Sequence, residues 1–245
     1  MDRRLDGFPA VLFDLDGVLT DTASIHSDCW KSMFDDYLRE RAAGLGEDFV
    51  EFDIAGDYHQ YVDGKPRYDG VRSFLASRGI ELPDGDPSDP PGSDTVCALG
   101  NRKNELVNDV LRRDGVTPYP GSMRLLDELA AAGVRMAVVS SSKNAPTVLA
   151  AAGISERFET VVDGAVAAAA GLPGKPAPDT FLAAAETLGV GRGEAVVVED
   201  AISGVEAGRN GNFGLVIGVA RADNEQALAA AGADLVVTDL GELAG

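Results

Sequence analysis

Short apolar runs alternate with stretches of helical spacing over the second half of the chain. Each run is short enough for a strand buried on both faces, and the stretches between carry apolar residues on one helical face. Strands separated by helices in this way predict an α/β fold with a doubly wound parallel sheet. The expected strands are residues 134–139, 158–162, 195–198, 215–219 and 235–237, and the expected helices 121–132, 145–152, 178–188, 201–209 and 224–231.

A further strand is expected much earlier, at residues 10–13, and it needs the same sheet to bury its two faces. The segment between, residues 22–117, lacks strand patterns and is predicted to be helical. We therefore expect a Rossmann-like core of residues 1–21 and 118–245, with residues 22–117 inserted as an all-helical cap domain. The helices expected in the cap are 24–41, 47–62, 69–77 and 95–113, with an exposed loop rich in Pro, Gly and Asp over 82–93.

The first strand ends in two aspartates, Asp14 and Asp16, followed by Gly17. Residues i and i+2 of an extended chain point to the same side, so the two carboxylates are expected to converge. Carboxylates held that close repel each other, and a metal ion or a shared proton relieves the repulsion. The simpler alternative is an ordinary turn after a strand, where Asp and Gly are common.

Two other expected strands also end in polar residues, at Ser140–Ser142 and at Glu199–Asp200, and Lys175 lies in a loop rich in Gly and Pro. Ligands of open parallel sheets bind outside the carboxyl ends of the strands, so these groups are expected to share one site with the two aspartates. Carboxylate oxygens suit Mg²⁺, and the sequence has no cysteine and histidine cluster for zinc.

The same residues can be given roles in phosphoryl transfer. One aspartate can attack phosphorus and form an aspartyl phosphate, while the other moves a proton to and from the exchanging oxygens. Lys175 and Mg²⁺ would neutralise charge on the transferring group, and Ser140 would donate a hydrogen bond to it.

The charge of the chain restricts its partners. With 40 acidic and 21 basic residues among 245, the net charge is −19, which argues against nucleic acid and anionic membranes as partners. Cys29 and Cys97 are too few for a disulfide framework and are expected to be buried in a protein of a reducing compartment. The N-terminus lacks the apolar stretch of a signal peptide, and no apolar run is long enough to span a membrane. We expect a cytoplasmic monomer.

The stretch from Asp14 to Thr22, Ser140, Lys175 with Pro176, and the pair Glu199–Asp200 resemble, in order, the four motifs of the haloacid dehalogenase superfamily. The resemblance covers the whole expected core. It implies that the helical insertion is a C1 cap, the type that follows the first motif in this superfamily.

The resemblance also implies roles for the motif residues. Asp14 would be the nucleophile and Asp16 the general acid and base. Mg²⁺ would be held by Asp14, by the main-chain carbonyl of Asp16 and by Asp200, with Glu199 assisting.

Within the superfamily the chain is most similar to the β-phosphoglucomutase subfamily, through the runs 21–26, 140–146 and 174–179. This similarity implies that His26 bonds to Asp16 and positions it. It also implies that Arg67 of the cap helps to bind a second, distal phosphate. The residues expected to bind the substrate with it are Ser141, Ser142, Lys143 and Asn144.

Three functions follow as hypotheses. The first is a Mg²⁺-dependent mutase that interconverts β-D-glucose 1-phosphate and glucose 6-phosphate through a bisphosphate. The second is a phosphatase of small sugar or polyol phosphates, and the third a non-catalytic protein on the same fold. Some of the assigned residues also have a plainer interpretation: a helix-face histidine for His26, a solvated arginine for Arg67, and an ordinary helix start for Lys143–Asn144.

Overall fold

The computed structural model describes residues 3–221 and 224–245. The first two residues of the N-terminus, which is expected to lack a signal peptide, lie outside the described residues. The chain forms two compact units. The first consists of Met1–Thr22, Gly64–Pro66 and Val116–Gly245, and the second of Ala23–Asp63 and Arg67–Gly115.

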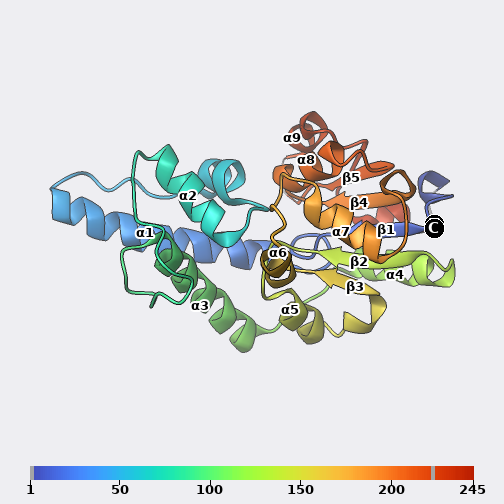
Figure 1. Ribbon diagram of the computed structural model, residues 1–245, viewed down its shortest axis with the longest axis horizontal. Helices are drawn as coiled ribbons and strands as arrows, with labels where there is room; N and C mark the ends of the chain where they lie inside the picture. The colour runs from blue at the N-terminus through green and yellow to red at the C-terminus, as the bar shows by residue number, and fades with distance from the viewer. Residues whose placement is uncertain (1–2, 222–223) are drawn as a thin grey trace. The chain divides into compact units, whose positions relative to one another are not determined.

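A six-stranded parallel sheet forms the centre of the first unit, in the order β3-β2-β1-β4-β5-β6 (Figure 1). This confirms the predicted doubly wound α/β fold. β1 pairs with β2 on one side and with β4 on the other, where the strand order changes direction, and such a switch point is where open α/β sheets bind ligands. The strands are β1 (Ala10–Phe13), β2 (Arg135–Val139), β3 (Thr160–Val162), β4 (Ala195–Glu199), β5 (Leu215–Val219) and β6 (Leu235–Val237).

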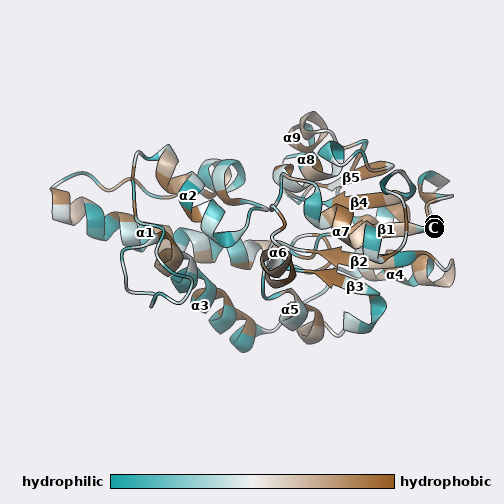
Figure 2. Cartoon of the chain, in the orientation of Figure 1, coloured by the Kyte–Doolittle hydropathy of each residue, from teal (hydrophilic) through white to brown (hydrophobic). Residues whose placement is uncertain are grey.

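Helices cover the sheet, and the strands are among the most hydrophobic segments of the chain (Figure 2). On one face, α7, α8 and α9 pack Phe181, Val205 and Leu228 against inward-facing residues of the strands such as Leu12 and Val197. The helices of this unit are α4 (Pro120–Ala131), α5 (Ala145–Ala151), α6 (Gly164–Ala170), α7 (Asp179–Thr187), α8 (Ile202–Asn210) and α9 (Glu225–Ala231), with 3₁₀ turns η1 (Arg3–Leu5), η3 (Ser155–Arg157), η4 (Arg192–Glu194) and η5 (Leu240–Leu243).

The second unit has an aromatic core of its own. The ring centroids of Phe34 and Phe74 lie 4.2 Å apart. The rings of Trp30 and Phe52 stack on that of Phe34, with centroid distances of 5.3 and 5.1 Å. Such pairs add about 0.5–1.5 kcal/mol each beyond the area they bury. The helical elements that supply this core are α1 (Ala23–Leu45), the π-helix η2 (Ile54–Val62), α2 (Arg67–Ser77) and α3 (Val96–Asp114).

One local prediction was wrong, and one helix was not predicted. The helix expected over 47–62 begins only at Ile54, because the side chain of Asp53 caps it by accepting hydrogen bonds from the N–H groups of Ala55 and Gly56. The residues before it have no regular secondary structure, and the Phe52 N–H donates to the buried Asp35 carboxylate at 2.7 Å. The alanine-rich stretch 164–170, not assigned to an element, forms helix α6 after the capping residue Asp163.

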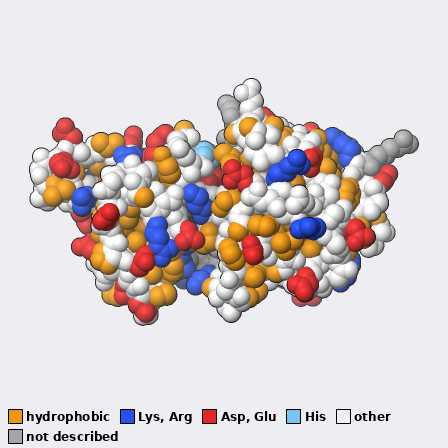
Figure 3. Space-filling view, turned by 45° about the horizontal axis from the view of Figure 1, so that its top comes forward, with side chains coloured by type: hydrophobic (Ala, Val, Ile, Leu, Met, Phe, Trp, Pro, Cys, Tyr) orange, Lys and Arg blue, Asp and Glu red, His pale blue; other side chains and the backbone are white. Residues whose placement is uncertain are grey.

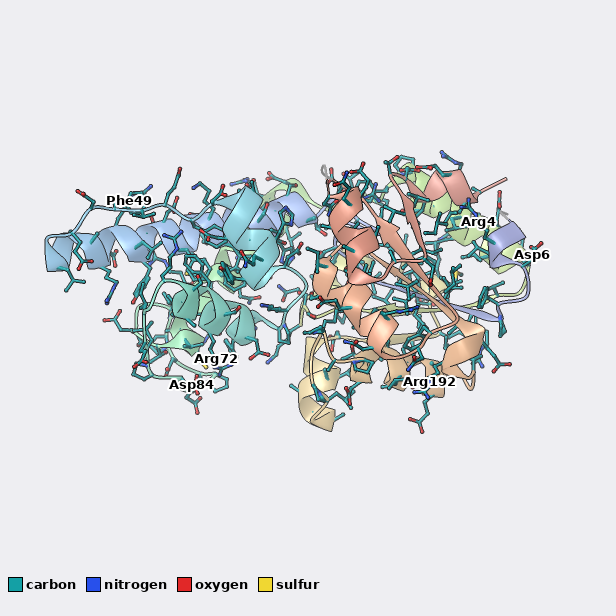
Figure 4. The ribbon with its side chains drawn as sticks, turned by 90° about the horizontal axis from the view of Figure 1, so that it is seen from above. Arg4, Asp6, Phe49, Arg72, Asp84 and Arg192 are labelled. Atoms are coloured by element: carbon teal, nitrogen blue, oxygen red, sulfur yellow. The ribbon has the colours of Figure 1, made fainter. Side chains whose placement is uncertain are left out.

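The loop expected over 82–93 contains no regular helix or strand. The guanidinium of Arg72 in α2 binds the carboxylate of Asp84 at 2.7 Å, and Figure 4 shows the two residues beside each other. Thr95 then caps α3 by accepting a hydrogen bond from the Ala98 N–H.

The molecular surface carries charges of both signs. On the face drawn in Figure 3, basic and acidic side chains are both present. Among the described residues, no helix is both long and apolar enough to cross a membrane.

Candidate active site

Asp14 lies at the carboxyl end of the central strand of the sheet. Its N–H donates to the carbonyl of Val198 at 2.9 Å, which extends the β1–β4 pairing by one residue. The side chain is buried. A carboxylate in this position is fixed by two neighbouring strands and directed toward the edge of the sheet where ligands bind.

Lys175 neutralises part of the acidic charge at this edge. Its ammonium donates to Asp14 Oδ1 at 2.6 Å and to the carbonyl of Val139 at 3.0 Å, and it forms an ion pair with Glu199. Burial alone would lower the pKa of Lys175, but the adjacent carboxylates outweigh this effect and raise it above the ordinary value. Lys175 is therefore a permanent cation between two acids.

Glu199 is completely buried at the end of β4. Burial raises the pKa of its carboxyl group to about 7, although Lys175 acts in the opposite direction. The N–H of Ala201 donates to Oε2 at 3.2 Å. A Cβ atom on Gly204 would lie 1.9 Å from the carboxyl carbon of Glu199, so only glycine leaves room for this side chain.

Three carboxylates at the sheet edge are close enough to bind one metal ion. Oxygen atoms of Asp14, Glu199 and Asp200 lie within 4.8 Å of one another. Such a set of hard, negatively charged donors fits Mg²⁺, and a divalent cation would relieve the repulsion between them. The carboxylate of Asp16 is not in this set; the carbonyl expected of it as a ligand stays a prediction.

Asp16 belongs to a tight turn after β1, residues 15–20, which we call the Asp16 turn. The carbonyl of Leu15 accepts hydrogen bonds from the N–H groups of Leu19 and Thr20, at 2.9 and 3.1 Å. Gly17 has a φ of +81°, a conformation that favours glycine. The hydroxyl of Thr22 donates to Asp16 Oδ1, so the orientation of the carboxylate is fixed from outside the turn.

The polar run after β2 is folded on itself. Ser140 is buried, and its hydroxyl oxygen accepts a hydrogen bond from the Ser142 N–H at 3.1 Å. The hydroxyl of Ser142 accepts one from the Asn144 N–H, also at 3.1 Å, at the start of α5. Lys143 is exposed. The run thus offers a cation and hydroxyl groups beside the strand end that carries Ser140.

Gly64–Pro66 belongs to the first unit, although the segments on both sides belong to the second. The hydroxyl of Ser141 donates to the Gly64 carbonyl at 2.7 Å. A Cβ on Gly64 would lie 2.2 Å from the Ser203 hydroxyl, and one on Gly174 would lie 2.2 Å from the Pro66 ring. Lys65 is therefore held close to the strand ends, and it was not among the residues predicted from the sequence. A signal was present, because Gly64-Lys65-Pro66 repeats the tripeptide around Lys175.

The second unit contains the other predicted residues, His26 and Arg67. His26 is partly buried, and its Nδ1 lies 2.7 Å from the ammonium of Lys103. Burial and the Lys103 charge hold the pKa of His26 well below its ordinary value, so its ring is neutral. Lys103 is itself buried, 5.0 Å from the Trp30 ring centroid. Lys103 was not predicted from the sequence, because a lone lysine in an amphipathic helix resembles a solvated one. The predicted bond between His26 and Asp16 stays a prediction.

Arg67 lies at the start of α2 and is partly buried. Burial lowers the pKa of its guanidinium group, which stacks over the Tyr68 ring at 5.3 Å.

Comparisons with known proteins agree with this geometry. A family model described as haloacid dehalogenase-like hydrolase matches residues 8–212. A β-phosphoglucomutase of Mycobacterium bovis is 56% identical over 247 residues, covering 98% of this chain and 94% of that protein. A fructose-1-phosphate phosphatase of Escherichia coli is 33% identical over 206 residues, covering 82% of this chain and 92% of that protein.

Among solved structures, a β-phosphoglucomutase from Clostridium difficile superposes with a TM-score of 0.74 at 26% identity. The match covers 96% of this chain and 93% of that one.

Proposed function

Because the chain belongs to the haloacid dehalogenase-like hydrolase family, we propose that it is a Mg²⁺-dependent β-phosphoglucomutase that interconverts β-D-glucose 1-phosphate and glucose 6-phosphate. The observation that carries the proposal is the 56% identity to a mycobacterial β-phosphoglucomutase over nearly the full length of both chains.

The geometry of the first unit supports a nucleophilic role for Asp14. Its carboxylate is buried at the switch point of the sheet, and the hydrogen bond from Lys175 to Oδ1 orients it. Attack of a carboxylate oxygen on phosphorus forms an aspartyl phosphate and releases the sugar oxygen. Lys175 lies where it can stabilise the negative charge on the transferring phosphoryl group.

We assign the proton transfers to Asp16. A group that protonates a leaving sugar oxygen and later deprotonates the incoming one must hold its carboxylate in a defined position. The hydrogen bond from Thr22 supports this role, since it fixes one carboxylate oxygen and leaves the other to act. Positioning by His26 is part of the same proposal.

Asp14, Glu199 and Asp200 would hold Mg²⁺, with the main-chain carbonyl of Asp16 as a further ligand. When bound, the ion would reduce the repulsion between the attacking carboxylate and the phosphate.

A mutase must also hold the phosphate that is not reacting, because the bisphosphate intermediate has to present each end of the sugar in turn. We propose that Arg67, Ser142, Lys143 and Asn144 bind this distal phosphate, with Ser141 beside them. Their donor groups and positive charges support the assignment, since arginine forms paired hydrogen bonds with phosphate oxygens. Lys65 is a further candidate.

A phosphatase of small sugar phosphates is the second candidate, and the similarity to the Escherichia coli fructose-1-phosphate phosphatase favours it. The two functions share the aspartyl phosphate and differ in whether a sugar hydroxyl or water accepts the phosphoryl group.

One assay separates them. The protein is given Mg²⁺, β-D-glucose 1-phosphate and a trace of glucose 1,6-bisphosphate, and both glucose 6-phosphate and free phosphate are measured. The mutase predicts glucose 6-phosphate in large excess, and the Asp14→Asn variant should produce neither. If free phosphate dominates with the wild-type protein, the mutase proposal is wrong.

A further inference from the structure

Arg221 binds the Asp16 turn from a distant part of the chain. It follows β5, and its side chain is largely buried, with 18% of its area exposed. The Nε–H group donates to the carbonyl of Gly17, and a terminal N–H group donates to the carbonyl of Val18 at 3.4 Å. Both carbonyls lie immediately after Asp16, and the hydroxyl of Ser122 donates to the second of them at 2.6 Å.

The rest of the Arg221 side chain is fixed as well. The other terminal nitrogen donates to the carbonyl of Thr238 at 3.2 Å, and the Asp239 carboxylate lies 3.8 Å away. The guanidinium plane covers the ring of Tyr119 with 3.7 Å between the guanidinium carbon and the ring centroid. Tyr119 in turn donates its hydroxyl to Asp21 Oδ1 at 2.9 Å.

These contacts make Arg221 different from a surface arginine. Hydrogen bonds from a charged donor are stronger than those between neutral groups, and a planar guanidinium can direct several of them at fixed angles. A lysine at this position would have a single nitrogen and could not reach carbonyls on both sides of the side chain.

We propose that Arg221 is a positioning residue for catalysis, which fixes the peptide groups after Asp16 and so orients its carboxylate and main-chain carbonyl. The inference deepens the proposed function and rests on the roles given there to Asp16. Sequence position alone gives no hint of it, since Arg221 and Gly17 are 204 residues apart.

The displacement expected without Arg221 is small, because Thr22 and Ser122 still hold the turn. A misplacement of about 1 Å of a catalytic group can nevertheless reduce the rate about 100-fold. The effect should therefore appear in the rate constant and in metal binding more than in substrate affinity.

The test compares Arg221→Lys and Arg221→Ala with the control Arg209→Ala. Arg209 is in the same unit, exposed at the end of α8, and 3.9 Å from the carboxylate of Asp234. We expect kcat to fall roughly 10- to 100-fold in both Arg221 variants with KM nearly unchanged, Mg²⁺ binding measured by calorimetry to weaken, and the control to match the wild type. Methylguanidinium added to Arg221→Ala should restore part of the rate, and methylammonium should not.

Unchanged kcat and Mg²⁺ affinity in folded Arg221→Lys would overturn the inference, as would a fall in melting temperature alone. Should Arg221→Ala not fold, Arg221→Lys and Tyr119→Leu, which removes the ring under the guanidinium, supply the same comparison.

Hydrolysis of p-nitrophenyl phosphate is measured in parallel, because it needs Asp14 and Asp16 but no mutase activity. If the wild type lacks mutase activity while the Arg221 variants still lose hydrolysis, the proposed substrate is wrong and the positioning role stands.

Discussion

The hydroxyl of Thr22 donates a hydrogen bond to Oδ1 of Asp16. Thr22 is completely buried, and its hydroxyl also lies 2.9 Å from that of Thr20, which donates to the Leu15 carbonyl. Two hydroxyls thus connect the start and the end of the Asp16 turn. The proposed general acid and base is held by Thr22, the last residue of the first segment of the first unit.

Replacing Thr22 by valine keeps the shape of the side chain and removes the hydroxyl. A hydrogen bond to a charged group contributes about 1.5–3 kcal/mol, so we expect kcat to fall about 10-fold or more while KM changes little. Steady-state kinetics measure this. Thr187→Val is the control, since Thr187 is exposed in α7 and its hydroxyl donates only to the Ala183 carbonyl. Equal rates in the two variants would contradict the role given to Thr22.

Removing the charge of Lys175 should affect both catalysis and stability. Lys175→Met leaves Asp14 and Glu199 buried without their cation, and breaking a buried ion pair costs about 3–5 kcal/mol. We expect kcat to fall about 100-fold or more, and the free energy of unfolding without Mg²⁺ to decrease by that amount. Kinetics and urea titrations provide the measurements.

The double variant Lys175→Met/Glu199→Gln serves as the matched comparison for stability. It removes one unpaired charge, so it should be more stable than Lys175→Met alone, while its activity stays low. The double variant could instead lose more stability than Lys175→Met and Glu199→Gln lose together. In that case the ion pair with Glu199 would not be the source of the stability that Lys175 contributes.

The sheet was predictable from the sequence because its strands are short apolar runs that end in polar residues. β1, β5 and β6 have the predicted bounds, and the polar residues at the ends of β1, β2 and β4 identified the candidate site. These signals are local, since burial on both faces and a site at strand ends each leave a pattern within a few residues.

What the sequence did not show depends on contacts between distant segments. The helix expected over 47–62 starts late because Asp53 caps it and because Asp35 binds the preceding segment. Lys103 and Arg221 have no distinguishing neighbours in the sequence, and only the fold brings them to His26 and Gly17. A single sequence contains no record of such pairings.

Gly204 provides a test of the space around Glu199. Its replacement by alanine would place Cβ 1.9 Å from the carboxyl carbon, so the carboxylate must move. We expect weaker Mg²⁺ binding in calorimetry and a fall in kcat of at least 10-fold, because misplaced groups lose rate steeply. The control is Gly44→Ala near the end of α1, where the new Cβ would meet nothing within 4 Å apart from its own helix backbone, so Mg²⁺ binding and kcat should match the wild type. Wild-type Mg²⁺ affinity in Gly204→Ala would show that Glu199 does not depend on this space.

The pKa values of the two histidines of the chain should be shifted in opposite directions from the ordinary value. A hydrogen bond with Asp63, 3.2 Å away, raises the pKa of His59 above 6.5, whereas burial and Lys103 hold that of His26 well below it. The stability that His59 contributes is therefore present below about pH 6.5 and is lost as the pH rises through its raised folded-state pKa. The contribution of a neutral His26 is present above about pH 6.5 and is lost on acidification.

NMR titration of the ring protons checks the two directions, with His59→Gln used to assign the signals. The same variant should lower the melting temperature at pH 5.5 more than at pH 8, since only the protonated His59 ring pairs fully with Asp63. His26 is present in both proteins, so its effect cancels from this difference. A difference in melting temperature that does not change with pH would show that the His59–Asp63 contact does not stabilise the folded protein through its charge.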